Sequence, residues 1–316
     1  MIKNVSVVIP SYKSACLVSR AINSILDSGV PAENIFVIED GVYDETAEVL
    51  SDIGKINHIQ LKQNKGAPYA RNIGLSLVKT EYVLFLDSDD YVSRDLVSGL
   101  YATAVDNQAS LVFGPWRYGG KKMGLKSIKR PTVLPAKKWV TRWLSEEFVP
   151  TCSVLWSTEF VKKVGGWNED LKQNQDGELA VRGLIAASKI AFSNSGYSVY
   201  WQHNSPNRIS RNSEENKLYT ANVIYNILSD WVMTIKLDIT QKKNIGAFCM
   251  KQCWSAVSCK KGKQEFSKWR ERANLFQYKN KGYSLKTNIM SSLLGITLSV
   301  LLRDYLHRPF VYFFKK

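Results

Sequence analysis

The chain has 316 residues, of which 45% are apolar, 11% are aromatic and 22% are charged. This composition supports a buried core and excludes a disordered or collagen-like chain. The formal net charge is +15, and it is unevenly distributed. Residues 1–120 carry 10 Lys and Arg against 14 Asp and Glu, residues 121–216 carry 15 against 9, and residues 217–316 carry 18 against 5. The basic end would suit nucleic acid, an anionic membrane surface or an anionic substrate, and composition does not choose among them.

The first 115 residues alternate strand-like runs with helix-like segments. Short runs rich in β-branched and aromatic residues predict strands, over Val5–Ile9, Ile35–Ile38, Ile56–Leu61 and Tyr82–Leu86. Apolar residues at helical spacing predict helices between them, over Ala15–Leu26, Glu45–Asp52, Pro68–Val78 and Arg94–Asp106. The alternation predicts an α/β fold with a mostly parallel sheet flanked by helices, in which a ligand binds beyond the carboxyl ends of the strands.

The remainder of the chain has a different pattern. A basic, Gly-rich connection over residues 118–131 is followed by short strands and by one helix from Asp176 to about Ser188. From residue 213 onward the sequence has few helix breakers, which predicts a helical region. We therefore expect two domains, residues 1–212 and a basic helical C-terminal region over residues 213–316.

The cysteines and the N-terminus indicate a compartment. Five cysteines form no Cys-x-x-Cys pair, and the three between residues 249 and 259 have no histidine nearby, which disfavours a zinc site. Reduced core thiols are expected, and the first residues do not have the shape of a signal peptide. Both observations favour the cytoplasm.

Polar residues follow the predicted strands. Pro10 and Tyr12 follow the first, and Asp40 follows the second. A carboxylate at a strand end can accept from a ribose hydroxyl or a base, or it can simply cap the next helix. Gly66 opens the helix that carries Arg71, an arrangement that suits close approach to a phosphate.

Three carboxylates, of Asp87, Asp89 and Asp90, lie within four residues directly after the fourth strand. They would repel one another in a low-dielectric setting unless they were solvated or neutralised by a cation. Oxygen ligands favour Mg²⁺ or Mn²⁺, shared with substrate phosphates. The alternative is a solvated acidic turn.

Acidic residues also begin the helix that starts near residue 176. Asp176 and Glu178 could simply stabilise the helix N-terminus through the helix dipole, or a carboxylate there could act as a general base. Farther along, His203 precedes Arg208 and Arg211. A lone histidine is more often a structural hydrogen-bonding group than a ligand.

In this order the motifs resemble the family 2 glycosyltransferases, which are inverting enzymes of the GT-A fold that use nucleotide-sugar donors. The resemblance runs from about residue 4 to about residue 211. The matching segments are Val5–Tyr12, similar to the family's first strand; Asn64–Gly74, similar to its Gly-x-x-x-Ala-Arg-Asn-x-Gly segment; Asp87-Ser88-Asp89, similar to its Asp-x-Asp signature; and Gln175-Asp176, which stands where the family has Glu-Asp or Gln-Asp. Glu39 and Val42 depart from the family pattern, so only Asp40 carries over from that segment.

The resemblance implies a role for each matching residue. Asp176 would be the catalytic base, Asp89 the metal ligand and Asp87 a neighbour of both ribose and metal. Asp40 would contact the nucleotide base. The other expected contacts to the donor nucleotide are Pro10, Tyr12, Gly66, Arg71, Asn72 and Ser88, with His203 on the pyrophosphate or metal. As a mechanistic hypothesis, Arg208 or Arg211 would help to stabilise the departing diphosphate.

We therefore expect an enzyme that moves a sugar from a nucleotide-diphosphate sugar, with uridine diphosphate as the expected nucleotide, to a hydroxyl of a glycan or lipid-linked acceptor in cell-surface polysaccharide synthesis. Mn²⁺ or Mg²⁺ would be the cofactor. Two other classes remain. A nucleotidyltransferase that makes nucleotide sugars would need a Gly-rich basic loop that residues 10–14 lack, and an inactive nucleotide-sugar-binding scaffold would keep the acids without turnover. No nucleic-acid recognition motif accompanies the charge.

The last hundred residues contain an uncharged run, Thr287–Leu302, of 16 residues. This is shorter than the ~20 residues that span a bilayer. Cations flank it, and aromatic residues and cations interleave at the end of the chain. A buried helix or a contact between two copies of the chain is one interpretation. The other is an interfacial helix on the inner face of the cell membrane, which the resemblance favours because bacterial members often act on lipid-linked acceptors.

Overall fold

The computed structural model describes residues 1–41, 45–51, 53–145, 147–202, 213–257, 259 and 262–276. The chain divides into two compact units, residues 1–211 and residues 212–316, and each is described by itself. His203, Arg208, Arg211 and the run Thr287–Leu302 lie outside the described residues.

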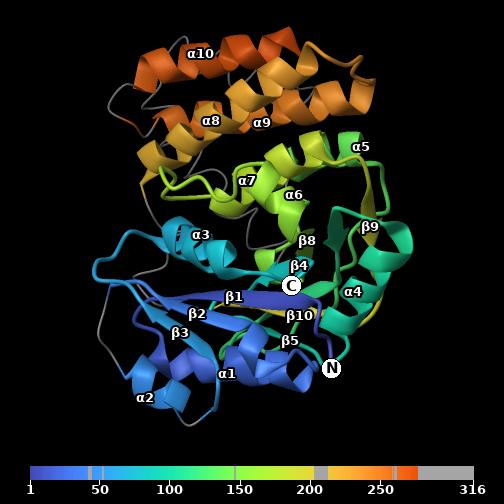
Figure 1. Ribbon diagram of the computed structural model, residues 1–316. Helices are drawn as coiled ribbons and strands as arrows, with labels where there is room; N and C mark the ends of the chain where they lie inside the picture. Colours follow the sequence, from blue (N-terminus) through green and yellow to red (C-terminus); the bar gives the residue numbers. More distant parts are fainter. Residues whose placement is uncertain are drawn as a thin grey trace. The chain divides into compact units, whose positions relative to one another are not determined.

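A seven-stranded sheet in the order β3-β2-β1-β4-β8-β6-β9 forms the centre of the first unit (Figure 1). Its strands are β1 (Val5–Ser11), β2 (Ile35–Glu39), β3 (Asn57–Gln60), β4 (Tyr82–Phe85), β6 (Leu111–Phe113), β8 (Val154–Ser157) and β9 (Ile190–Phe192). Neighbours are parallel except that β8 runs antiparallel to both β4 and β6. The predicted mostly parallel sheet is confirmed.

A second, three-stranded sheet has the order β5-β10-β7. Its strands are β5 (Tyr91–Val92), β7 (Trp116–Gly119) and β10 (Ser198–Trp201). Strand β10 is antiparallel to β5 and parallel to β7. Because β5 follows the acidic turn directly in sequence, this small sheet begins beside the candidate site.

Helices cover both faces of the large sheet, and Figure 1 shows α3 on one face with α1 and α2 on the other. The α-helices of this unit are α1 (Ala15–Asp27), α2 (Thr46–Ser51), α3 (Ala67–Leu77), α4 (Leu96–Asn107), α5 (Ala136–Leu144), α6 (Thr158–Lys163) and α7 (Gln175–Ala186). Two 3₁₀ turns, Ala32–Asn34 and Thr151–Ser153, complete it. One core joins the apolar faces of α1 and α4 to β1, β2 and β4, for example Ile22 and Leu100 against Val7 and Leu84, all fully buried.

Proline fixes where the central pairing ends. Strands β1 and β4 pair as far as Val8 and Phe85, and the N–H of Leu86 donates to the carbonyl of Val8. The next donor of a parallel ladder would come from residue 10, and Pro10 has no N–H. The β1–β4 pairing therefore stops there, and the chain leaves the sheet as it reaches Asp87. Strand β1 itself continues to Ser11 along β2, two residues beyond its predicted end.

A glycine brings α3 close to the same place. A Cβ atom at Gly74 would lie 2.3 Å from Cγ1 of Val8. Only a residue without a side chain lets the helix pack this closely against β1. Arg71, one turn earlier on α3, is thereby held beside the end of β4.

The second unit contains the helices α8 (Glu214–Val232), α9 (Ile239–Val257) and α10 (Gly262–Leu275). Within it, the Arg272 guanidinium lies 3.9 Å from the ring centre of Tyr225 and 4.4 Å from that of Trp269, and it donates to Oδ1 of Asn222 (2.8 Å). Among the described residues, no helix has the length and apolar character needed to cross a bilayer.

Candidate functional site

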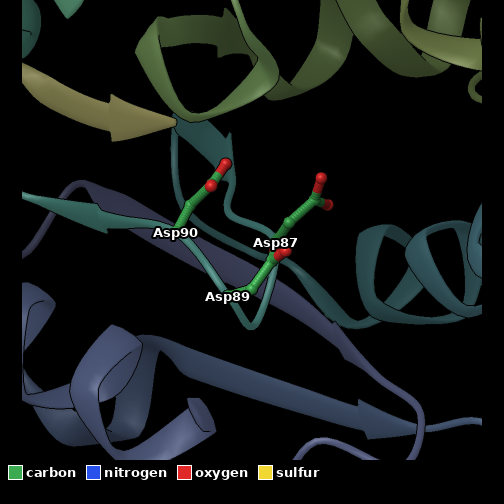
Figure 2. Close-up of side chains that lie close together, drawn as sticks. All are labelled: Asp87, Asp89 and Asp90. Carbon is green, nitrogen blue, oxygen red and sulfur yellow. The ribbon is translucent and has the colours of Figure 1, made fainter. Parts of the chain in front are cut away.

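The acidic turn after β4 brings its three predicted carboxylates together. One carboxylate oxygen from each of Asp87, Asp89 and Asp90 lies within 4.8 Å of the others (Figure 2). Asp87 and Asp89 are half-buried, whereas Asp90 is buried. An all-oxygen donor set with two partly exposed members fits a hard divalent cation such as Mg²⁺ or Mn²⁺.

Asp90 is the buried member of the three, and its carboxylate accepts a hydrogen bond from the protein backbone. Its Oδ1 accepts a hydrogen bond from the N–H of Trp201 at the end of β10 (2.8 Å). Burial raises the pKa of Asp90 well above its ordinary value, and the charges of Asp89 and Asp87 raise it further. Asp90 therefore anchors the turn to the small sheet.

Arg71 connects this turn to helix α7. Its Nη2 donates to Oδ1 of Asp87 (2.5 Å) and its Nη1 donates to Oε1 of Gln175 (3.3 Å). The guanidinium carbon lies 4.3 Å from the ring centre of Trp167, within cation–π range. Arg71 is only 6% exposed, so a fixed positive charge stands beside the acidic turn.

Asp176 lies next to Gln175 in the first turn of α7 and is half-buried. Burial raises the pKa of Asp176, and the positive charge of Arg71 opposes that rise. The charge of Asp87 also raises the pKa of Asp176. The structure therefore brings Asp176, Arg71 and Asp87 into one electrostatic cluster, although 89 residues separate the two carboxylates in sequence.

The family model for glycosyl transferase family 2 matches residues 6–162, which contain the acidic turn and Arg71. The chain belongs to the family 2 glycosyltransferases. This confirms the family that the motifs of the sequence resemble.

Relatives and solved structures agree with this assignment. The poly(ribitol-phosphate) β-N-acetylglucosaminyltransferase TarP of Staphylococcus aureus is 34% identical over 125 residues, which make up 38% of this chain and 38% of TarP. Alignments with other curated relatives span as little as 16% of the relative's length.

Two solved structures show the fold. S. aureus TarS 1–349 in complex with UDP-GlcNAc has a TM-score of 0.60 and 18% identity over 88% of this chain and 93% of that one. A mannosyltransferase from Pyrobaculum calidifontis in complex with GDP-Man and Mn²⁺ has a TM-score of 0.53 and 13% identity over 96% and 84%. The GT-A type of fold is confirmed.

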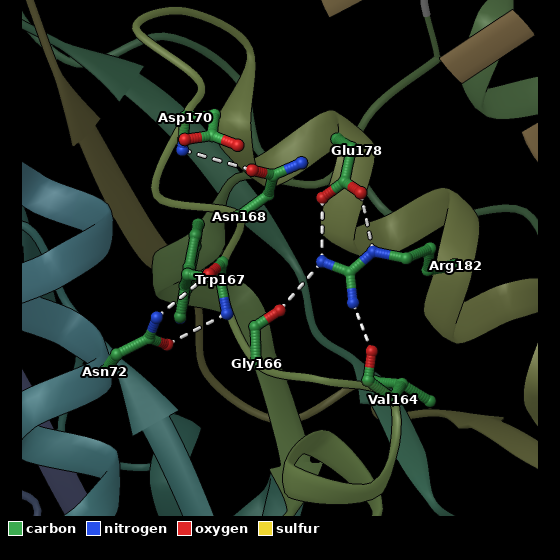
Figure 3. Close-up of polar contacts among 8 residues, drawn as sticks. All are labelled: Asn72, Val164, Gly166, Trp167, Asn168, Asp170, Glu178 and Arg182. Carbon is green, nitrogen blue, oxygen red and sulfur yellow. Dashed lines mark hydrogen bonds and ion pairs between the residues drawn. The ribbon is translucent and has the colours of Figure 1, made fainter. Parts of the chain in front are cut away.

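In this glycosyltransferase, hydrogen bonds from α7 and from α3 hold the loop that precedes α7 (Figure 3). Arg182 on α7 donates to both carboxylate oxygens of Glu178 (2.6 and 2.7 Å), to the carbonyl of Gly166 (2.7 Å) and to that of Val164. Glu178 is 2% exposed. This second acid of α7 is therefore a structural partner of Arg182.

Asn72 on α3 holds the other side of the loop. Its amide donates to the carbonyl of Trp167 (2.9 Å) and to Oε1 of Glu169 (2.7 Å), and its Oδ1 accepts from the N–H of Trp167 (2.9 Å). These bonds fix Trp167 against Arg71. Asn72 thus positions Trp167, which forms part of the wall of the site. The contact of Asn72 with the nucleotide, which the sequence implies, stays a prediction.

The remaining predicted nucleotide contacts lie near the ends of β1, β2 and β4 and at the start of α3. Asp40 is buried, and its two carboxylate oxygens accept from the backbone N–H groups of Lys65 (2.8 Å) and Gly66 (2.7 Å). Gly66 has a φ of +94°, which glycine adopts without strain. Pro10 is buried, Ser88 is half-buried and Tyr12 is 44% exposed. Asp40 therefore shapes the loop that opens α3.

Arg20 is a residue of the site that no sequence motif predicts. Arg20 on α1 donates to the backbone carbonyl of Asp89 (2.5 Å), and its guanidinium lies 4.7 Å from the ring centre of Tyr91 and 4.3 Å from that of Trp201. It therefore links α1 to the backbone of the acidic turn. No motif marks it, because a single arginine within an amphipathic helix is an ordinary feature.

Replacing Arg182 by methionine should destabilise the first unit. The change would leave Glu178 buried without its partner, and losing one member of a buried ion pair costs about 3–5 kcal/mol. Urea unfolding at 25 °C measures the loss. Arg142→Met is the matched control, because its ion pair with Glu147 is more than 30% exposed on both sides, and such a pair contributes about 1 kcal/mol or less. Similar losses of unfolding free energy in the two variants would contradict the structural role of the Arg182–Glu178 pair.

Proposed function

We propose that this glycosyltransferase moves a sugar, with inversion, from a nucleotide-diphosphate sugar to a hydroxyl of a glycan or lipid-linked acceptor in cell-surface polysaccharide synthesis. Uridine diphosphate is the proposed nucleotide. The observation that carries the proposal is the bridge made by Arg71, which joins Asp87 of the acidic turn to the first turn of α7, where Asp176 lies. The UDP-GlcNAc complex of TarS and the polymer in the name of TarP support the choice of donor and process.

Asp176 acts as the general base. Its carboxylate takes the proton from the acceptor hydroxyl as that oxygen forms a bond to the anomeric carbon. The bond between the anomeric carbon and the diphosphate oxygen breaks on the opposite side, so the configuration inverts. Burial raises the pKa of Asp176, which makes its carboxylate a stronger base.

Asp87 and Asp89 would hold a Mn²⁺ or Mg²⁺ ion. When bound, such an ion stabilises the negative charge of a departing diphosphate. Arg71 keeps the Asp87 carboxylate in place, and Asp90 and Arg20 keep the backbone of the turn in place. The proposed nucleotide contacts are Pro10, Tyr12, Asp40, Gly66, Arg71, Asn72 and Ser88, of which Tyr12 is exposed.

Incubating the full chain with a panel of nucleotide-diphosphate sugars, Mn²⁺ and glycan acceptors tests the proposal. Release of nucleoside diphosphate, with a glycoside of the opposite anomeric configuration detected by NMR, is expected. A product that retains the donor's configuration would contradict inversion. Pyrophosphate release from a nucleoside triphosphate and a sugar phosphate would instead assign a nucleotidyltransferase, and no release from any donor would assign a binding protein.

We also propose that the chain docks on an anionic membrane surface through its last hundred residues, which carry 18 Lys and Arg against 5 Asp and Glu. Such a charge excess is attracted to acidic headgroups. In a flotation assay the full chain should rise with vesicles that contain anionic lipid and stay down with zwitterionic vesicles at about 0.1 M salt. Equal flotation with both would argue against electrostatic docking.

A further inference from the structure

We propose that the acceptor is an anionic polysaccharide, a sugar or polyol chain that bears phosphate or carboxylate groups, and that it binds to residues 116–130, called here the basic hairpin. The assignment of this chain as the acceptor rests on the proposed function. The binding itself is argued from the charge, exposure and position of the hairpin.

The basic hairpin is an ordered extension of the small sheet. Trp116 and Lys129 exchange two backbone hydrogen bonds (2.9 and 2.6 Å), and the N–H of Lys126 donates to the carbonyl of Tyr118 (2.9 Å). Nε of Arg117 donates to the carbonyl of Lys126 across the two arms (2.6 Å). The backbone of the hairpin is thus held in one conformation before any ligand binds.

The hairpin carries a dense positive charge. Six of its fifteen residues are cations, namely Arg117, Lys121, Lys122, Lys126, Lys129 and Arg130, and the sequence has no acidic residue between Asp106 and Glu146. All but Arg117 are exposed. Lys121, Lys122, Lys126 and Arg130 form no ion pair with any residue in the described part of the chain. Uncompensated cations on one exposed element raise the local concentration of anions and suit a ligand with repeated negative charges.

Aromatic rings fix the base of the hairpin. Trp116 packs on Tyr118 (4.9 Å between ring centres) and on Phe148 (5.1 Å), and Nζ of Lys129 lies 4.9 Å from the ring centres of both Trp116 and Tyr118. These contacts keep one cation over the rings. They also lower the conformational entropy that the hairpin would lose when a polymer binds.

A single strand, β10, lies between the hairpin and the acidic turn. Strand β7, which begins the hairpin, pairs with β10 from Trp116–Ser198 to Gly119–Trp201, and the N–H of Trp201 donates to Asp90. One strand spacing is about 4.8 Å. Only strand β10 therefore separates the first arm of the hairpin from Asp90, the third acid of the turn. A polymer bound to the hairpin would lie close to the site of sugar transfer, which favours an acceptor substrate over a nucleic acid.

The experiment compares two triple variants of the full chain with equal changes of charge. The hairpin variant is Lys121→Gln, Lys122→Gln and Lys126→Gln. The control is Lys3→Gln, Lys55→Gln and Lys62→Gln, three exposed lysines elsewhere in the same unit. Both should keep the wild-type melting temperature. Binding is measured at about 0.1 M salt to dextran, dextran phosphate, polygalacturonate, the RNA homopolymer poly(U) and anionic vesicles.

Wild type should bind dextran phosphate or polygalacturonate and not neutral dextran; which of the two binds more tightly distinguishes phosphate from carboxylate. Each exposed ion pair contributes about a factor of two to three, so the hairpin variant should bind about 8- to 27-fold more weakly, and the control within about twofold. Equal weakening in both variants would overturn the proposal, as would tighter hairpin-dependent binding of poly(U) or of vesicles. If hairpin-dependent polysaccharide binding persists in a chain that releases no nucleotide from any donor, the proposed function fails and the surface stands.

Discussion

Asp176→Asn is expected to reduce sugar transfer by about 10²–10⁴-fold, the usual contribution of a general base. The amide has nearly the same size as the carboxylate but cannot accept the acceptor's proton. Donor binding should stay within about threefold of wild type, because Arg71 and the acidic turn remain in place. Release of nucleoside diphosphate in the presence of acceptor measures the rate, and titration calorimetry measures donor affinity.

The matched control for this variant is Asp170→Asn. Asp170 is exposed and lies in the loop just before α7, so its neutralisation removes the same charge six residues away. It should leave transfer unchanged. If Asp176→Asn retained transfer within about threefold of wild type, another residue would have to be the base.

Asp89→Ala is expected to lose cation-dependent donor binding and turnover together. Asp89 is one of the two half-buried carboxylates of the turn, and the third, Asp90, already accepts from the backbone of Trp201. Removing one of two charged ligands should weaken Mn²⁺ binding by at least about the 10–100-fold seen for less direct changes around metal sites. Mn²⁺ titration and turnover measured with and without EDTA test this.

Asp95→Ala serves as the control, because Asp95 is an exposed acid at the start of α4 whose side chain makes no capping hydrogen bond. It should keep the wild-type response to Mn²⁺. Turnover that continues undiminished in excess EDTA would remove the cation from the reaction altogether.

The sequence predicts the elements that depend on local pattern. Strands β1, β2 and β4 are continuous apolar runs, α1 and α3 show helical spacing, and the acids that follow β4 are adjacent in sequence. The position of these acids also follows from general topology, because the carboxyl ends of parallel strands share one edge of the sheet. Asp87 and Asp89 lie at that edge, and Arg71 lies beside them because Gly74 lets α3 pack closely on β1.

Other parts depend on contacts between distant segments, which local pattern does not reveal. Strand β5 has two residues, and β10 pairs with β7, which lies about 80 residues earlier. The anchoring of Asp90 by Trp201 depends on that pairing. The separate roles of Asp176 and Glu178 depend on Arg182, whose four-residue spacing from Glu178 is visible in the sequence but whose hold on the carbonyls of Gly166 and Val164 is not.

The central claim is that the acidic turn, Arg71 and Asp176 form one cation-dependent nucleotide-sugar site. Calorimetric titration of the full chain with UDP, in Mn²⁺ and again in EDTA, tests it most directly. Binding in Mn²⁺ that weakens at least about tenfold in EDTA, and that loses this difference in Asp89→Ala, is the predicted result. Equal UDP affinity with and without the cation would contradict the account.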